Sequence, residues 1–135
     1  MGKGQKLYSK AKQIVAGGNM LLSKRPEMFL PEHWPAYFSK TKGCEVWDLD
    51  GNKYIDTLMM PGTNSLGYSH PEVDEAVKET ISNGNMSSLN APEEVELTER
   101  LVELHPWADM ARFARSGGEA NSVAIRLSRA ASGRD

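Results

Sequence analysis

The sequence predicts an α/β protein, and three patterns support this prediction. Apolar residues recur at helical spacing in four segments of the chain. Between residues 37 and 57, aromatic and β-branched residues instead alternate with polar ones, which is typical of strands. A short strand candidate at residues 110–114 then passes through two glycines into the last helical pattern. Because a strand, a glycine turn and a helix form the repeating unit of α/β sheets, this order favours that fold class.

The first helix is predicted from about Gln5 to Ala16. Leu7, Ala11 and Ile14 lie on one side of it, and the pair Gly17-Gly18 supplies a C-terminal stop. Residues 19–38 contain three prolines among scattered aromatic residues, so an irregular connection is expected there.

A β-meander of two or three antiparallel strands is predicted over Tyr37 to Thr57. Its strongest signal is Asp50-Gly51, which stands between two short runs of strand-forming residues. Glycine adopts the positive φ that a tight hairpin turn requires. Residues 61–69 are rich in glycine and serine and are expected to form a loop.

Two helices are predicted next. Pro71 suits the first helical position, where its missing N–H costs nothing, and Gly84 marks the end of that helix. Pro92 and the glutamates after it predict a second helix that runs to Pro106, because acidic residues favour the positive end of a helix dipole. Each helix carries one apolar stripe that is expected to face a core.

The last unit is predicted to be a strand at Met110 to Ala114, a turn at residues 116–118 and a helix from Glu119 to about Ala131. A parallel strand needs a partner strand beyond the following helix, and the sequence has no candidate for one. We therefore expect an α/β sheet that is cut off after its first strand.

The turn Ser116-Gly117-Gly118 is the candidate binding site. A strand that leads through glycines into a helix leaves several backbone N–H groups directed at one place, where the helix dipole adds positive charge. Such a place binds a phosphate group, and glycine permits close approach of the backbone. A plain tight turn with a helix cap is the alternative for these three residues.

Other classes of function receive no support. The net charge of −2 gives no general attraction for nucleic acid or for anionic membranes. No apolar run approaches the about 20 residues of a membrane-spanning helix. The lone Cys44 excludes an intrachain disulfide and fits a cytoplasmic address. His33, His70 and His105 lie far apart in the sequence without cysteine partners, so no metal site is predicted.

Several spaced residues together resemble the N-terminal signature of class III aminotransferases. They are Gly43, Trp47-Asp48, Asp50-Gly51, Tyr54-Ile55-Asp56, Leu66-Gly67, His70-Pro71, Val73 and Ala76. The stretch from Ala91 to Leu97 and the run SGGEANSVAIRLSRAASGRD are similar to the glutamate-1-semialdehyde aminomutase branch of that family. The resemblance extends from about Leu7 to Asp135. One departure is Gly118, which stands where the aminomutases have threonine.

The resemblance implies the N-terminal portion of a fold-type I transferase that depends on pyridoxal phosphate. It implies residues 1–60 as an N-terminal helix and meander segment, and residues 61–135 as the beginning of the large cofactor-binding domain. Ser116, Gly117 and Gly118 would hold the cofactor's phosphate. The implied partners are a small amino or keto substrate and, in the full-length protein, a second identical subunit.

The resemblance also implies that the lysine that forms the Schiff base lies beyond residue 135. None of the nine lysines in the sequence stands in a matching context, so no catalytic residue is assigned and the 135 residues alone are predicted to be inactive. The expected function is therefore amino-group transfer, as an aminotransferase or an aminomutase, with this chain contributing the phosphate turn. A non-catalytic phosphate-binding or dimerisation module derived from that family is the alternative.

Overall fold

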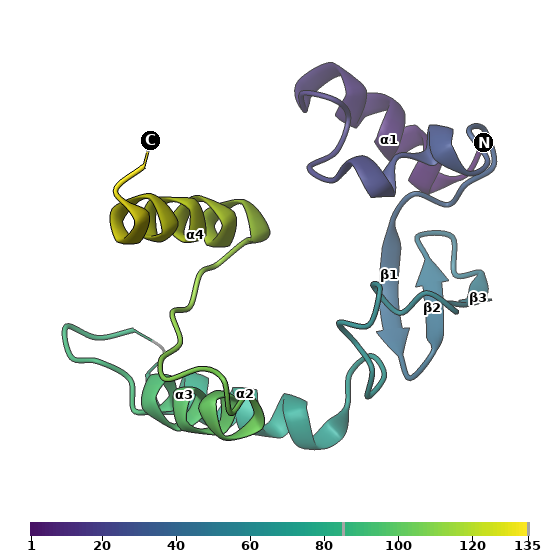
Figure 1. Ribbon diagram of the computed structural model, residues 1–135. Coiled ribbons are helices and arrows are strands. Elements are labelled where there is room, and N and C mark those ends of the chain that lie inside the picture. Colours follow the sequence, from purple (N-terminus) through teal and green to yellow (C-terminus); the bar gives the residue numbers. More distant parts are fainter. Residues whose placement is uncertain (85, 135) are drawn as a thin grey trace. The chain divides into compact units, whose positions relative to one another are not determined.

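The computed structural model describes residues 1–84 and 86–134. The chain divides into two compact units, Met1–Asn83 and Gly84–Asp135. The first unit contains helix α1, a three-stranded sheet and helix α2, and the second contains helices α3 and α4 (Figure 1). The sequence boundary between residues 60 and 61 stays a prediction.

Helix α1, Lys3–Ile14, has one buried face, on which Gly4, Tyr8 and Ala11 recur. A Cβ at Gly4 would lie 1.9 Å from the carbonyl oxygen of Pro35, so only glycine permits this close approach. Beyond the helix, Gly17 and its neighbour have φ values of 75° and 78°, which confirms the predicted stop.

The connection after α1 is irregular, as predicted, and contains two short 3₁₀ turns, Leu22–Lys24 and Pro26–Met28. Pro26 is fully buried. The Tyr8 hydroxyl donates to the Glu27 carboxylate at 2.8 Å, and Lys12 forms an ion pair with the same carboxylate at 3.6 Å. These contacts fasten the connection to α1.

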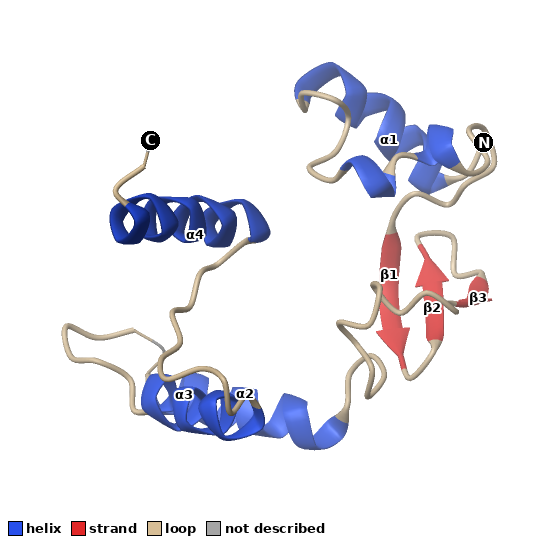
Figure 2. Ribbon diagram, in the orientation of Figure 1, coloured by secondary structure: helices blue, strands red, loops and turns tan. Residues whose placement is uncertain are grey.

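The predicted meander is confirmed as three antiparallel strands in the order β1-β2-β3 (Figure 2). Their bounds are Phe38–Lys42, Glu45–Asp48 and Lys53–Ile55. Lys42 pairs with Glu45 across the first turn, and the ladder is irregular between Phe38 and Lys40. Gly51 has a φ of 86°, which is the left-handed conformation that the sequence predicted for the second turn.

Asp48 organises the β2–β3 hairpin and is only 6% exposed. Its carboxylate accepts hydrogen bonds from the Asp50 and Asn52 backbone N–H groups, the Asn52 side-chain amide and the Tyr54 hydroxyl, at 2.9 to 3.0 Å. The hydrogen bond from the Asn52 side chain, joined by the others and opposed by burial, lowers the pKa of Asp48 below its usual value. Four hydrogen bonds therefore stabilise the buried carboxylate.

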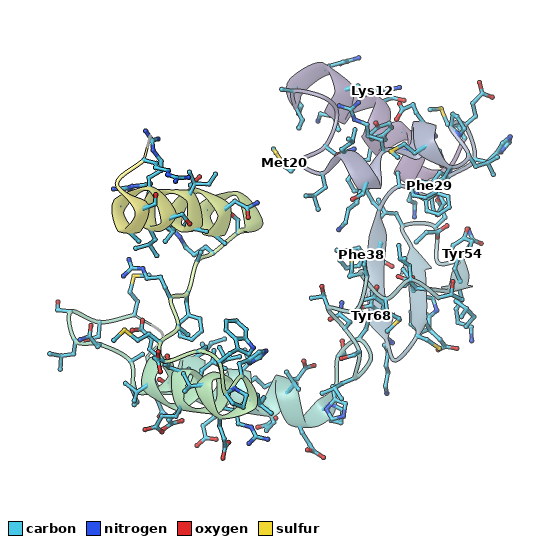
Figure 3. All side chains as sticks on the ribbon, viewed as in Figure 1. Lys12, Met20, Phe29, Phe38, Tyr54 and Tyr68 are labelled. Atoms are coloured by element: carbon cyan, nitrogen blue, oxygen red, sulfur yellow. The ribbon has the colours of Figure 1, made fainter. Side chains whose placement is uncertain are left out.

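Asp56 forms hydrogen bonds with both ends of the loop that follows β3, residues 57–69. Its carboxylate accepts from the Leu58 and Met59 N–H groups and, at 2.6 Å, from the Tyr68 hydroxyl. The Tyr68 backbone makes two further hydrogen bonds with Gly43, at 2.8 and 2.9 Å. Tyr54 and Tyr68 are labelled beside the sheet in Figure 3. The loop therefore returns to the meander before α2 begins.

Three further helices follow: α2 at Pro71–Asn83, α3 at Glu93–Leu104 and α4 at Gly117–Ser132. Pro71 occupies the first position of α2, as predicted. None of these three helices has a buried residue in the described structure. Ile81 is 58% exposed, and Leu97 and Leu104 are 51% and 57% exposed. The apolar stripes that the sequence predicted to face a core are therefore uncovered here.

Two predictions in the second unit were wrong. Residues 110–114 form no strand, because no other segment among residues 1–84 and 86–134 pairs with them in a ladder. A strand is stable only with its partners, so β propensity alone does not produce one. Helix α4 also begins at Gly117, two residues earlier than predicted, and it takes both glycines into its first turn.

Candidate functional site

The candidate site is the N-terminus of α4, which Ser116 caps. Ser116 has an extended backbone, with φ −152° and ψ 160°, and its hydroxyl oxygen accepts a hydrogen bond from the Glu119 N–H at 3.3 Å. The Ala120 N–H donates to the Ser116 carbonyl at 2.9 Å and starts the helical ladder. Serine is a preferred capping residue because its oxygen satisfies one of the donors that a helix start leaves without partners.

Gly117 and Gly118 keep their backbone N–H groups available. Within the described part of the chain, neither N–H has a hydrogen-bond partner. A Cβ added at either glycine would meet nothing within 4 Å. Neither residue has a positive φ, so the local backbone does not require glycine at these positions. The free space and the two unpaired donors instead fit an anionic group that approaches the helix end.

The Ser116 hydroxyl adds a third donor to the same place. Its oxygen accepts from Glu119, and its proton remains available for a ligand oxygen. Two backbone N–H groups and one hydroxyl therefore lie at the positive end of a 16-residue helix. The residues present fit a phosphate group.

A carboxylate stands close to this turn and forms an ion pair with Arg115. One oxygen of Glu119 accepts from the Arg115 backbone N–H at 3.0 Å and from the Arg115 guanidinium at 3.3 Å. The backbone hydrogen bond, assisted by the guanidinium and by the charge of Arg112, lowers the pKa of Glu119 below its usual value. The side chain is therefore ionised at neutral pH and is paired with Arg115.

The structure places the three predicted site residues together, but in a different conformation from the one expected. The sequence predicted a glycine turn before the helix, whereas both glycines are helical. Sequence reasoning also missed the role of Glu119. The signal was present, since Ser116 followed three residues later by glutamate is the pattern of a helix-capping box.

An open groove of about 870 Å³ lies elsewhere in the second unit, between α3 and residues 109–113. Val95, Val102 and Phe113 contribute apolar surface to it, whereas Glu94, Glu99, Glu103 and Asp109 line it with carboxylates. Only Arg112 contributes a positive charge among its lining residues. This acidic lining disfavours a phosphate, so the groove is a poor alternative to the helix terminus.

The histidines take part in local contacts. His105 bonds the Leu101 carbonyl at 2.9 Å and stacks edge-on against Trp107, and the His70 carbonyl accepts from the Asp74 N–H. Among the residues that the structure describes, no group of three or more histidine, cysteine or acidic side chains could hold a metal ion. In the same residues, no helix combines the length and the apolar character needed to cross a membrane.

Comparison with known proteins identifies the family. The model of class III aminotransferases matches residues 30–135. The 3-aminobutyryl-CoA aminotransferase of Cloacimonas acidaminovorans is 37% identical over 99% of this chain and 32% of that protein. The glutamate-1-semialdehyde 2,1-aminomutase of Methanothermobacter thermautotrophicus is 38% identical over 98% of this chain and 30% of that protein. The chain thus spans about a third of the length of these relatives.

A solved structure supports the same assignment. FumI from Sphingopyxis sp. MTA144, determined with pyridoxal phosphate, superimposes with a TM-score of 0.86 at 33% identity, over 98% of this chain and 32% of that one. This likeness confirms the predicted fold, the N-terminal portion of a fold-type I transferase that depends on pyridoxal phosphate. The chain belongs to the class III aminotransferase family.

Proposed function

We propose that this chain is the cofactor-phosphate-binding segment of an enzyme that transfers amino groups with pyridoxal phosphate. Pyridoxal phosphate is the cofactor of the family. The observation that carries the proposal is the pair of unpaired N–H groups at Gly117 and Gly118, at the capped end of α4. A dianionic phosphate matches both their direction and the sign of the helix dipole.

Each residue of the turn has a definite part in holding the cofactor. The Gly117 and Gly118 N–H groups donate to phosphate oxygens, and the Ser116 hydroxyl donates a third hydrogen bond. Charge-assisted hydrogen bonds of this kind are about twice as strong as neutral ones. The absence of side chains at both glycines lets the phosphate reach the backbone. Bound pyridoxal phosphate supplies the electron-accepting ring that amino-group transfer requires.

The reactive lysine is proposed to come from outside these 135 residues. All nine lysines lie at or before Lys78, and none of them stands in a sequence context that resembles that of the family's reactive lysine. A lysine amine is needed to form a Schiff base with the cofactor and to transfer a proton between the substrate and the cofactor. The segment therefore binds and orients the cofactor, and a further part of the complete protein performs the chemistry.

The proposed substrate is a small amino or keto compound, since the relatives named above are an aminotransferase and an aminomutase. We further propose that the complete protein is a homodimer, as the family resemblance implies. Its proposed address is the cytoplasm. The free thiol of Cys44 fits the reducing conditions of that compartment.

Substitution at Gly118 tests the proposal. Gly118→Val in the complete protein should lower the affinity for pyridoxal phosphate by about tenfold or more, because the branched side chain would fill the space of a phosphate oxygen. Apart from the adjoining backbone of its own helix, nothing lies within 4 Å of a Cβ at that position, so the fold itself has room for the substitution.

Ser128→Val is the matched control. It introduces the same side chain into the same helix, about 15 Å further along it. Equal affinities of the two variants for pyridoxal phosphate, measured by equilibrium titration, would refute the phosphate-site assignment.

A further inference from the structure

Glu119 joins the segment before α4 to the first turn of the helix. Its side-chain oxygen accepts from the Arg115 backbone N–H at 3.0 Å, while its own N–H donates to the Ser116 hydroxyl at 3.3 Å. In an ordinary capping box the glutamate side chain returns to the N–H of the capping residue itself. Here it reaches one residue further back. Residues 115–119 are therefore linked by two hydrogen bonds that run in opposite directions along the chain.

This arrangement leaves the phosphate donors free. Glu119 takes up the Arg115 N–H and the Ser116 oxygen, whereas the N–H groups of Gly117 and Gly118 stay without partners in the described chain. The hydrogen bonds also fix the angle at which the chain enters the helix. A phosphate that binds afterwards does not have to order this turn, so less conformational entropy is lost on binding.

The charge of Glu119 suits the positive end of the helix but opposes the binding of a second anion there. A carboxylate in the first turn of a helix competes with an incoming anion for the positive end of the dipole. Its ion pair with the Arg115 guanidinium, at 3.3 Å, offsets part of this repulsion. A purely electrostatic view therefore predicts that loss of the Glu119 charge strengthens phosphate binding, whereas a geometric role predicts that loss of its hydrogen bond weakens it.

We infer that Glu119 is a positioning residue for the cofactor phosphate, and that it acts through its hydrogen bond to the Arg115 backbone and not through its charge. The inference rests on the proposed function, since it assigns a second residue to the same site. The proposed role is to fix the conformation of residues 115–119 before the phosphate binds, because Glu119 itself does not contact the phosphate.

Two substitutions separate geometry from charge. Glu119→Gln keeps the length of the side chain and an oxygen that accepts from the Arg115 N–H, but it removes the charge. Glu119→Asp keeps the charge and shortens the side chain by one methylene, so that it no longer reaches that N–H. In the complete protein, we expect Gln to bind pyridoxal phosphate within about threefold of the wild type. We expect Asp to lose about three- to tenfold, the range for one hydrogen bond.

A spectroscopic measurement accompanies the affinities. The ³¹P resonance of the bound phosphate should match the wild type in the Gln variant and should shift in the Asp variant, because only the latter changes the geometry of the donors. Glu103→Gln and Glu103→Asp are matched controls, since Glu103 pairs with Arg100 on α3 and lies outside the turn. Both should leave the affinity and the resonance unchanged.

The outcomes are decisive for the inference. If Asp retains the affinity and Gln loses it, or if both behave alike, Glu119 has no positioning role. Melting of each protein without cofactor identifies a variant that fails to fold, and weak binding by a folded Gln variant is by itself sufficient to contradict the inference. Gly118→Val keeps the two proposals distinguishable. If Gly118→Val binds pyridoxal phosphate normally, the phosphate-site assignment itself is wrong. If Gly118→Val binds weakly while Glu119→Gln and Glu119→Asp bind equally well, only the role of Glu119 is removed.

Discussion

Gly4 shows how a single missing side chain determines packing. It lies in the first turn of α1, and a Cβ there would stand 1.9 Å from the Pro35 carbonyl oxygen. A backbone atom cannot move aside as the end of a flexible side chain can. Nothing in the sequence marks this glycine, because a contact across about 30 residues has no local pattern. The contact becomes visible only in the folded structure.

Gly4→Ala should therefore destabilise the protein by about 1–3 kcal/mol, the usual range for overpacking. Gly117→Ala is the control, since that glycine is also helical and has open space around it. The control should be stabilising by up to about 1 kcal/mol, because alanine is the better helix former. Urea denaturation measures both. Equal effects of the two substitutions would show that α1 does not approach Pro35 this closely.

The Tyr68–Asp56 pair makes the first unit sensitive to alkali. The hydrogen bond to Asp56, together with burial, raises the pKa of Tyr68 to about 12. The pKa of a free tyrosine is about 10. Because the folded state holds the proton more tightly than the unfolded state, the stabilisation is complete below about pH 10 and is lost as the pH rises towards 12.

Tyr68→Phe should reduce the loss of stability at alkaline pH. The smaller contributions of Tyr8 and Tyr54, whose pKa values are also raised, should remain. Melting temperatures between pH 8 and pH 12, followed by the fluorescence of the tryptophans, provide the measurement. Cys44→Ser is a suitable control because that side chain is exposed and lies in the turn between β1 and β2. An unchanged alkaline slope in Tyr68→Phe would contradict the assigned hydrogen bond.

At the scale of elements, the sequence predicted the helices and the meander well. Their signals are local: Pro71 at a helix start, Gly51 in a hairpin and the Gly17-Gly18 stop all act within a few residues. One of the two failures was not local. Residues 110–114 were predicted to be a strand from their place before a glycine turn and a helix, but a strand also needs a partner, and the local sequence does not supply one. The other failure, the early start of α4, has a local cause: Ser116 is the capping residue, so both glycines lie inside the helix.

Ser116→Ala tests this cap. Loss of the hydroxyl should destabilise α4 by about 1 kcal/mol, because the Glu119 N–H then loses its acceptor. In the complete protein it should also weaken cofactor binding, since one phosphate donor disappears. Ser122→Ala is the matched control: its hydroxyl donates to the Gly118 carbonyl within the helix, so its loss should be close to neutral. Circular dichroism melts and cofactor titration of the two variants give the comparison.

At the scale of the whole molecule, the uncovered apolar faces are the dominant feature. Each large apolar side chain that stays in water forgoes about 1.5–3 kcal/mol, and the net stability of a domain is only about 5–15 kcal/mol. Helices α2, α3 and α4 each present such side chains. The helical periodicity of the sequence predicted which residues form these faces, but it contains no information about what covers them.

We predict that residues 1–135 by themselves are marginally stable or self-associate. Sedimentation at several dilutions and a thermal melt would test this. The same protein should also form no specific covalent adduct with pyridoxal phosphate after borohydride reduction, because we propose that the reactive lysine lies outside these residues. A sharply melting monomer at micromolar concentration would contradict the first expectation, and a stoichiometric adduct on one lysine would contradict the second.

The central claim, that Gly117 and Gly118 bind the cofactor phosphate, is tested most directly by NMR of the complete protein labelled with ¹⁵N-glycine. Addition of pyridoxal phosphate should move the amide proton resonances of both glycines downfield, because each N–H acquires a charged acceptor. Pyridoxal, which lacks the phosphate, should leave them close to their original positions. If the cofactor binds and these two resonances stay in place while those of other glycines move, the phosphate lies elsewhere and the account is wrong.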